Sequence, residues 1–193
     1  MKVIVTTSHR PTTRTRSFVK DLVAVIPNSS RFTRGKATFN LLALLATDFN
    51  ADRILVVRNW KGNPRFLDIY AVEPLGPSTK KICTIVLKGI KLAREAKCGY
   101  PPFKPKRVVV PISDVNDEES EKLVECLSRG LYINPVDSVE EVCRNDRGST
   151  LVLRITCTPQ GFRELKFYDC EGRQFGPVIR VWKTKLYLDT MQK

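Results

Sequence analysis

The chain has 193 residues, of which 42% are hydrophobic and 27% charged, a composition that is typical of folded proteins and excludes a disordered chain. It has no long apolar run and no basic-then-apolar N-terminal segment, so neither a membrane span nor a secretory signal is expected, and the expected location is cytoplasmic. The net charge is +13, and it is unevenly distributed, because residues 1–96 carry 17 Lys and Arg against 6 acids and residues 97–193 carry 16 against 14. This asymmetry predicts a polyanionic partner, above all nucleic acid, for the first half.

The first half begins with a strand and an amphipathic helix. The strand is expected over residues 3–8. The helix should start near Thr12 or Thr13, since threonine is a favourable N-cap, and Pro27-Asn28 should end it. Apolar residues recur at helical spacing and predict one buried face, formed by Phe18, Val19, Leu22, Val25 and Ile26.

A second helix and three strands complete the first half. The helix is expected at about residues 37–49 and is apolar almost all round, so it should be buried. Strands follow near 53–59, 65–73 and 81–88, and Gly62-Asn63-Pro64 should form the turn between the first two.

The second half follows an extended linker, residues 97–106, whose three prolines exclude a helix. A strand at 107–112 and a helix at 117–129 come next, and the acids at the start of this helix suit its dipole. Ser138, with Glu141 three positions on, should cap a short helix at 138–144. The last strands are expected near 150–157, 162–169 and 178–188.

The two halves repeat one pattern of elements. Residues 54–70 and 150–166 align with a shift of 96 positions, which places Arg58 on Arg154 and Phe66 on Phe162. We therefore predict an α/β fold made of two similar α/β halves from an internal duplication, each a mixed sheet with helices. The halves are residues 1–96 and 97–193. The alternative is that two similar patterns occur by coincidence.

Residues suited to catalysis or metal binding are scarce. The six cysteines form no C-x-x-C pair and His9 is the single histidine, so we expect no metal site and no cofactor. Most cysteines are expected to be buried thiols, with disulfides as the alternative if the source is a hyperthermophile. His9 has no evident acid nearby and no nucleotide-binding glycine loop is present, so no catalytic residue is assigned and an enzyme is not expected.

The strongest functional signal is the basic stretch of residues 8–36. It leaves a strand, enters a helix and continues into the next loop, and Asp21 is its single acid. Strand-to-helix junctions of α/β folds bind ligands, and the free N–H groups of a helix start favour anions. We expect RNA phosphates and riboses to be contacted here by seven residues, namely Arg10, Arg14, Arg16, Lys20, Arg31, Arg34 and Lys36. The alternative is a basic surface without a specific ligand.

Three aromatic residues lie among basic ones. Trp60 stands at the first hairpin turn. Its side chain could stack on RNA or cover the sheet, and the sequence favours neither role. For Phe32, next to Arg31, packing is favoured over stacking. For Trp182, on the last strand with Arg180, packing is also favoured.

The opening stretch resembles the start of the Brix domain, a family of ribosome-biogenesis proteins. In that pattern a strand ends in Thr-Ser, an Arg-rich turn and a helix with a Lys-Asp-Leu step follow, and Pro-Asn and Arg-Gly come after it. The matching residues here are Thr7-Ser8, Pro11, Arg14, Arg16, Phe18, Lys20-Asp21-Leu22, Pro27-Asn28 and Arg34-Gly35. A later Gly-Pro-Thr step appears as Gly76-Pro77-Ser78, and His9 stands where Arg or Lys is usual.

The resemblance covers the whole chain, as a single Brix domain of residues 1–193, and is greatest to the small-subunit processome member and its archaeal counterparts. It implies halves like the anticodon-binding domain of class IIa aminoacyl-tRNA synthetases. It also implies binding of ribosomal RNA or its precursor during rRNA processing, with other assembly proteins as partners. The main alternative function is a protein–protein adaptor in a ribonucleoprotein, with only incidental RNA contact. An RNA-modifying or synthetase-like enzyme is the other.

Overall fold

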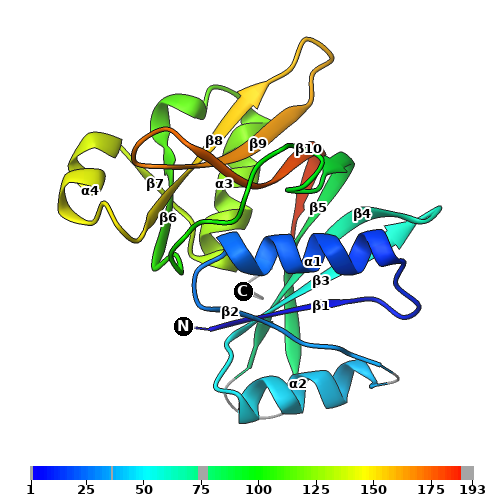
Figure 1. Cartoon of the computed structure of the whole chain (residues 1–193). Coiled ribbons are helices and arrows are strands. Elements are labelled where there is room, and N and C mark those ends of the chain that lie inside the picture. The colour runs from blue at the N-terminus through cyan, green and yellow to red at the C-terminus, as the bar shows by residue number, and fades with distance from the viewer. Residues whose placement is uncertain (1, 36, 74–77, 188–193) are drawn as a thin grey trace, which may run out of the picture.

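One large mixed sheet organises the protein, whose computed structural model describes residues 2–35, 37–73 and 78–187 (Figure 1). In chain order, the first half contains β1 (Val3–Thr7), α1 (Thr13–Val25), β2 (Ser29–Arg31), α2 (Phe39–Asp48), β3 (Arg53–Trp60), β4 (Asn63–Val72) and β5 (Thr79–Lys91). The second half contains β6 (Arg107–Pro111), a 3₁₀ turn (Ile112–Asp114), α3 (Glu118–Leu131), β7 (Asn134–Val136), α4 (Val139–Asn145), β8 (Thr150–Cys157), β9 (Arg163–Asp169) and β10 (Gln174–Leu186). The predicted α/β class and mixed sheet are confirmed.

The sheet is centred on β5 and β10, which pair antiparallel and join the two halves. Outward from β5 come β4, β3, β1 and β2, and outward from β10 come β9, β8, β6 and β7. In each half the three outermost strands are parallel and the others antiparallel. The carboxyl ends of β1, β2 and β3 consequently lie along one edge of the sheet.

Helices α1 and α3 cover the same face of the sheet, and their apolar residues belong to one buried cluster. All five residues predicted for the apolar face of α1 are buried. From α3 the cluster receives Leu123 and Leu127, and from the central strands it receives Leu87 and Val181. The core therefore runs without interruption from one half into the other.

Helix α2 lies on the opposite face, over β1 and β3 (Figure 1). It buries Leu42, Ala43 and Ala46, whereas Leu41 and Leu44 are 45% and 46% exposed. The prediction that this helix is buried is therefore correct for one side only. Its outward-facing leucines are exposed because α2 packs with one side only on the sheet.

The caps that the sequence predicts are formed. The side chain of Thr12 accepts a hydrogen bond from the Thr15 N–H at the start of α1. Ser138 accepts one from the Glu141 N–H at the start of α4. At the start of α3, where the sequence predicted only acids that suit the dipole, Asp117 is the acceptor.

Two short strands and one turn differ from the predictions. β2 and β7 each have three residues; β2 lies where a loop was expected, and no element was predicted at the position of β7. The first hairpin turns at Lys61 and Gly62, and Asn63 already belongs to β4. Both turn residues have positive φ, 48° and 84°, as in the tight turns that close two-residue hairpins.

Four cysteines form two disulfides, so the expectation that most are buried thiols was wrong. Cys83 of β5 is bonded to Cys126 of α3, which links the two halves, and Cys143 of α4 is bonded to Cys170. Cys98 and Cys157 are free thiols. Spacing along the chain could not reveal these pairs, because their partners are 43 and 27 positions apart.

Candidate nucleic-acid interface

Three segments of the first half meet at the sheet edge where β1, β2 and β3 end. The Ser8 N–H donates to the Val57 carbonyl, 3.0 Å away, so the loop after β1 starts beside β3. The Thr6 hydroxyl donates to the Phe32 carbonyl over 2.8 Å and holds the loop after β2. The β1–α1 loop, the β2–α2 loop and the β3–β4 hairpin are thereby fixed next to one another.

The N-terminus of α1 is attached directly to the hairpin. The Thr12 hydroxyl donates to the Gly62 carbonyl over 2.9 Å while it caps the helix. The helix start and the hairpin turn thus form one continuous part of this edge.

Four of the seven predicted phosphate contacts are exposed: Arg10, Arg16, Lys20 and Arg31. Arg10 follows the end of β1, Arg31 is the last residue of the neighbouring β2, and Arg16 lies in the first turn of α1. Lys20 stands seven residues after the start of α1, about 10 Å along the helix axis, and is therefore farther from the edge. We call Arg10, Arg16, Arg31 and the half-buried Arg34 the basic edge.

Arg34 and Lys36 complete the predicted set. The Arg34 Nε donates to the Ala37 carbonyl over 2.9 Å, and its guanidinium lies 5.6 Å from the Phe39 ring centre. These contacts hold its stem and leave its charge partly exposed. Lys36 lies outside the described residues.

Arg14 is engaged within the protein. Its guanidinium pairs with both carboxylate oxygens of Glu95 and donates to the Ile90 carbonyl over 3.1 Å. The hydrogen bonds from Arg14 lower the pKa of Glu95. Arg14 therefore fastens α1 to the end of β5, a structural role that the sequence did not indicate.

Asp21, the acid in the basic stretch, is buried. Its carboxylate accepts hydrogen bonds of 2.8 Å from the Ala93 N–H and from the Tyr100 hydroxyl. Burial together with this hydrogen bond raises the pKa of Tyr100 to about 12. Because Asp21 is inside, every exposed charge on residues 8–35 is positive.

The three aromatic residues lie in different environments. Phe32 packs against the core under α2, with its ring centre 6.5 Å from that of Phe49, as favoured. Trp60 is 62% exposed on the hairpin and so does not cover the sheet. Trp182 is 48% exposed, so the expectation that it packs was wrong. The pairing of β10 skips Trp182, which breaks the alternation on which that expectation relied.

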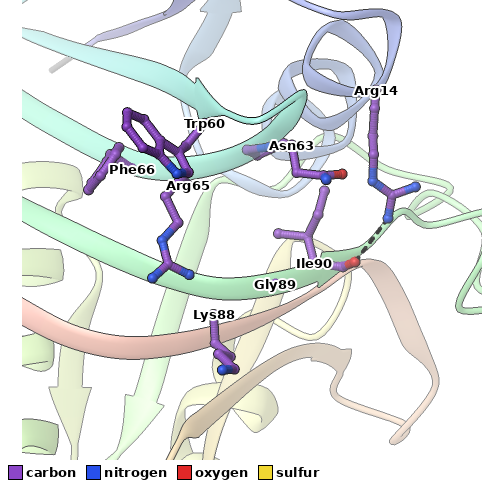
Figure 2. Close-up of a pocket in the computed structure, with 9 residues that line it drawn as sticks. Arg14, Trp60, Asn63, Arg65, Phe66, Lys88, Gly89 and Ile90 are labelled. Carbon is purple, nitrogen blue, oxygen red and sulfur yellow. Dashed lines mark hydrogen bonds between the residues drawn. The ribbon is translucent and has the colours of Figure 1, made fainter.

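A cleft of about 580 Å³ opens beside the hairpin, and Figure 2 shows its lining. We call it the hairpin cleft. Its described lining has three basic and two aromatic side chains and no acid, and consists of Arg14, Trp60, Asn63, Pro64, Arg65, Phe66, Lys88, Gly89 and Ile90. Of these, only Arg14 and Trp60 were named as functional candidates from the sequence. A tryptophan next to Lys61 was the available signal, whereas Arg65 and Lys88 reach the cleft through long-range strand pairing.

Features of metal-binding and membrane-spanning proteins are not found in the described part of the chain. Among the residues that the structure describes, no group of three or more His, Cys, Asp or Glu is arranged to hold a metal ion. None of the described helices is both long and apolar enough to cross a membrane.

Comparisons with known proteins identify relatives of the chain. A probable Brix domain-containing ribosomal biogenesis protein of Methanopyrus kandleri is 33% identical over 186 residues, which are 94% of each chain. Its Aeropyrum pernix counterpart is 46% identical over 106 residues, which cover 54% of this chain and 58% of that protein. The match to the Pyrococcus horikoshii counterpart covers 47% of that protein, so the chain spans about half the length of several curated relatives.

More distant and structural similarities agree. The U3 small nucleolar ribonucleoprotein protein IMP4 of Bos taurus is 32% identical over 88 residues, which are 45% of this chain and 30% of that protein. The crystal structure of a probable ribosomal biogenesis protein from Aeropyrum pernix superimposes with a TM-score of 0.78 at 31% identity, over 94% of this chain and 96% of that one. No protein-family model matches the sequence. Since the identity to the Methanopyrus kandleri protein extends over nearly all of both chains, this protein belongs to the family of Brix domain-containing ribosomal biogenesis proteins.

Proposed function

We propose that this protein is a ribosome-assembly factor that binds ribosomal RNA or its precursor through the basic edge. The observation that carries the proposal is the burial of Asp21, which leaves only positive charge exposed on residues 8–35. Backbone N–H groups at the start of α1 add to the attraction for phosphate. Family membership supports the setting, since the relatives are named as ribosomal biogenesis proteins and IMP4 as a ribonucleoprotein component.

The individual residues have different proposed roles. Arg10, Arg16 and Arg31 contact phosphates and riboses at the edge, and Lys20 extends the contact along α1. Arg34 contributes a partly buried charge, and Lys36 belongs to the set on its sequence position alone. Arg14 mainly holds α1 in place, because Glu95 already balances its charge.

We also propose that residues 1–193 form a single Brix domain that arose by an internal duplication. The duplication gave two halves, a basic one of residues 1–96 and a near-neutral one of residues 97–193. The support is the strand order, which runs outward from β5 and from β10 through equivalent elements. Each half would then resemble the anticodon-binding domain of class IIa aminoacyl-tRNA synthetases. The role is non-enzymatic, with the second half available to other assembly proteins.

Filter binding tests the RNA contact. The probe is a transcript of an archaeal small-subunit ribosomal RNA precursor, titrated at several salt concentrations between about 50 and 200 mM. Arg10→Ala with Arg16→Ala should weaken binding and reduce the slope of log affinity against log salt by about one for each phosphate that the variant no longer neutralises.

A matched variant controls for total charge. Arg144→Ala with Arg147→Ala removes the same charge from exposed positions in and after α4, which lies far from the start of α1 (Figure 1). This variant should keep nearly wild-type affinity and slope. Equal losses in both variants would exclude a localised site. Wild-type binding weaker than about 100 μM, with binding to a purified assembly protein instead, would favour an adaptor.

A further inference from the structure

The hairpin cleft combines features that bind single-stranded nucleic acid. Figure 2 shows Trp60, Arg65 and Lys88 along one side and Arg14 opposite them. Its volume of about 580 Å³ lies in the range of small-molecule sites. It therefore has room for one nucleotide but not for a helix of RNA.

Bulges in three neighbouring strands supply side chains to this region. Arg65 is skipped on β4, between the residues Pro64 and Phe66 that pair with β3. Lys88 on β5 and Trp182 on β10 are skipped at two successive shifts in the pairing of those strands. Bulges re-aim side chains and are enriched at functional sites. Here they concentrate two cations and one aromatic ring where β4, β5 and β10 lie side by side.

Among the described residues, no acid balances the charges of Arg65 and Lys88. The Arg65 guanidinium lies 5.4 Å from the Trp182 ring centre, and the Lys88 ammonium lies 5.1 Å from that of Phe162. Within the described ranges neither forms an ion pair with a carboxylate. Other cations of α1, β3, β5 and β10 do form such pairs, namely Arg14, Arg58, Lys81 and Arg180. Arg65 and Lys88 thus remain available for an anionic ligand.

Trp60 offers an exposed aromatic face. It is 62% exposed although it belongs to β3, and the hairpin that carries it is held by the Thr12 hydroxyl. An exposed tryptophan on an anchored turn can stack on a base of any sequence. In a duplex the bases stack on one another and their faces are not accessible, so the ring selects single-stranded RNA.

We infer that the hairpin cleft binds one unstacked nucleotide of a single-stranded RNA segment, with the base on Trp60 and the flanking phosphates on Arg65 and Lys88. The inference rests on the proposed RNA-binding function and specifies the form of RNA that is recognised. Its residues are distinct from those of the basic edge. The two sites are neighbours, since Thr12 joins the start of α1 to the hairpin.

Tryptophan fluorescence provides the test, because the chain has only two tryptophans. In a Trp182→Phe background all tryptophan emission comes from Trp60. A short single-stranded oligouridine should quench this emission and saturate, whereas a blunt duplex of the same length should quench it much less. Equal quenching by both probes, or none by the single strand, would overturn the inference.

Affinity measurements on variants complete the test. Trp60→Leu should lower affinity for the single strand by about 5- to 150-fold, the range found when one base loses its stacking partner. Arg65→Ala with Lys88→Ala should lower it too, and the charge-matched Arg144→Ala with Arg147→Ala should not. Thermal melting verifies that each variant is folded.

The outcomes separate this inference from the proposed function. If Arg10→Ala with Arg16→Ala weakens binding of the ribosomal transcript while the cleft variants bind oligouridine like the wild type, the cleft assignment fails and the basic edge stands. If neither set of variants changes RNA binding, both fail.

Discussion

Arg14 of α1 forms a two-point ion pair with Glu95, 81 positions further along the chain. The same guanidinium donates to the Ile90 carbonyl at the end of β5. An arginine that the sequence suggests as an RNA contact thus connects the first helix to the centre of the sheet.

Breaking this pair should affect stability and RNA binding differently. Both side chains are about one-third exposed (34% and 33%), so water screens the pair. A double-mutant cycle with Arg14→Ala and Glu95→Gln, measured by urea unfolding, should give a coupling free energy of about 1 kcal/mol or less. Glu95→Gln alone should strengthen RNA binding, because it releases the charge of Arg14 beside the hairpin cleft. An equal gain in the Arg14→Ala background would contradict this explanation.

Asp68 should make stability depend on acid pH. Asp68 is 1% exposed. It accepts hydrogen bonds from Arg58 and Thr84 and forms an ion pair with Lys81. Burial raises the pKa of Asp68, but these partners outweigh burial and lower the pKa below its usual value. The stabilisation is therefore complete above the unfolded pKa of about 3.9 and is lost as pH falls through the lower folded value.

Melting temperature as a function of pH tests this prediction. The melting temperature of the wild type should stay constant from neutral pH to about pH 5 and should fall below about pH 4. Asp68→Asn should lose about 2–3 kcal/mol of unfolding free energy at neutral pH and decline less steeply in acid. Glu140→Gln removes an exposed carboxylate and is the control. An Asp68→Asn profile parallel to wild type would assign the acid sensitivity to other groups.

The two disulfides should respond to reductant in a fixed order. Cys83 and Cys126 are fully buried, whereas Cys143 and Cys170 are partly exposed. Mild reduction of the native protein should therefore open Cys143–Cys170 first, as peptide mass mapping of alkylated thiols can measure. Cys83→Ala with Cys126→Ala should lower the unfolding free energy by roughly 3–4 kcal/mol, because the bond closes a loop of 43 positions. Earlier labelling of Cys83 would contradict the predicted order.

Gly130 should resist replacement although it lies inside helix α3. Alanine favours helices over glycine by about 1 kcal/mol, but a Cβ here would lie 2.8 Å from Cγ2 of Ile69 on the sheet. Gly130→Ala should therefore destabilise the protein, by up to about 2 kcal/mol after the helix preference is subtracted. Gly148→Ala is the control, since nothing lies within 4 Å of its added Cβ. The loss of unfolding free energy caused by Gly130→Ala should be smaller in an Ile69→Ala background. An unchanged loss would exclude the contact with Ile69 as its cause.

The elements were predictable where local physics decides them. The start of α1 at Thr13, the apolar face from Phe18 to Ile26 and the cap at Ser138 follow from side chains a few residues apart. The long strands follow from apolar runs between turn residues. The three-residue strands β2 and β7 were missed because they are defined by their hydrogen bonds to β1 and β6. Three residues are too few to form a strand pattern of their own.

The candidate site was predictable in part. The charge of residues 8–36 and the exposure of Arg10, Arg16, Lys20 and Arg31 could be read from the sequence. The removal of Asp21 to the interior could not, since its partners Ala93 and Tyr100 are 72 and 79 positions away. The hairpin cleft depends on strand bulges, which no local pattern reveals.

By itself the sequence determined the class of fold, the positions of most helices and strands, and the concentration of positive charge in the first half. Only the tertiary structure decided which charges remain exposed, which cysteines pair, and that Trp60, Arg65 and Lys88 line one cleft. The physical reason is range. Caps, turns and amphipathic faces form between near neighbours in the chain, whereas ion pairs, disulfides and clefts form between segments that meet only when the sheet has assembled.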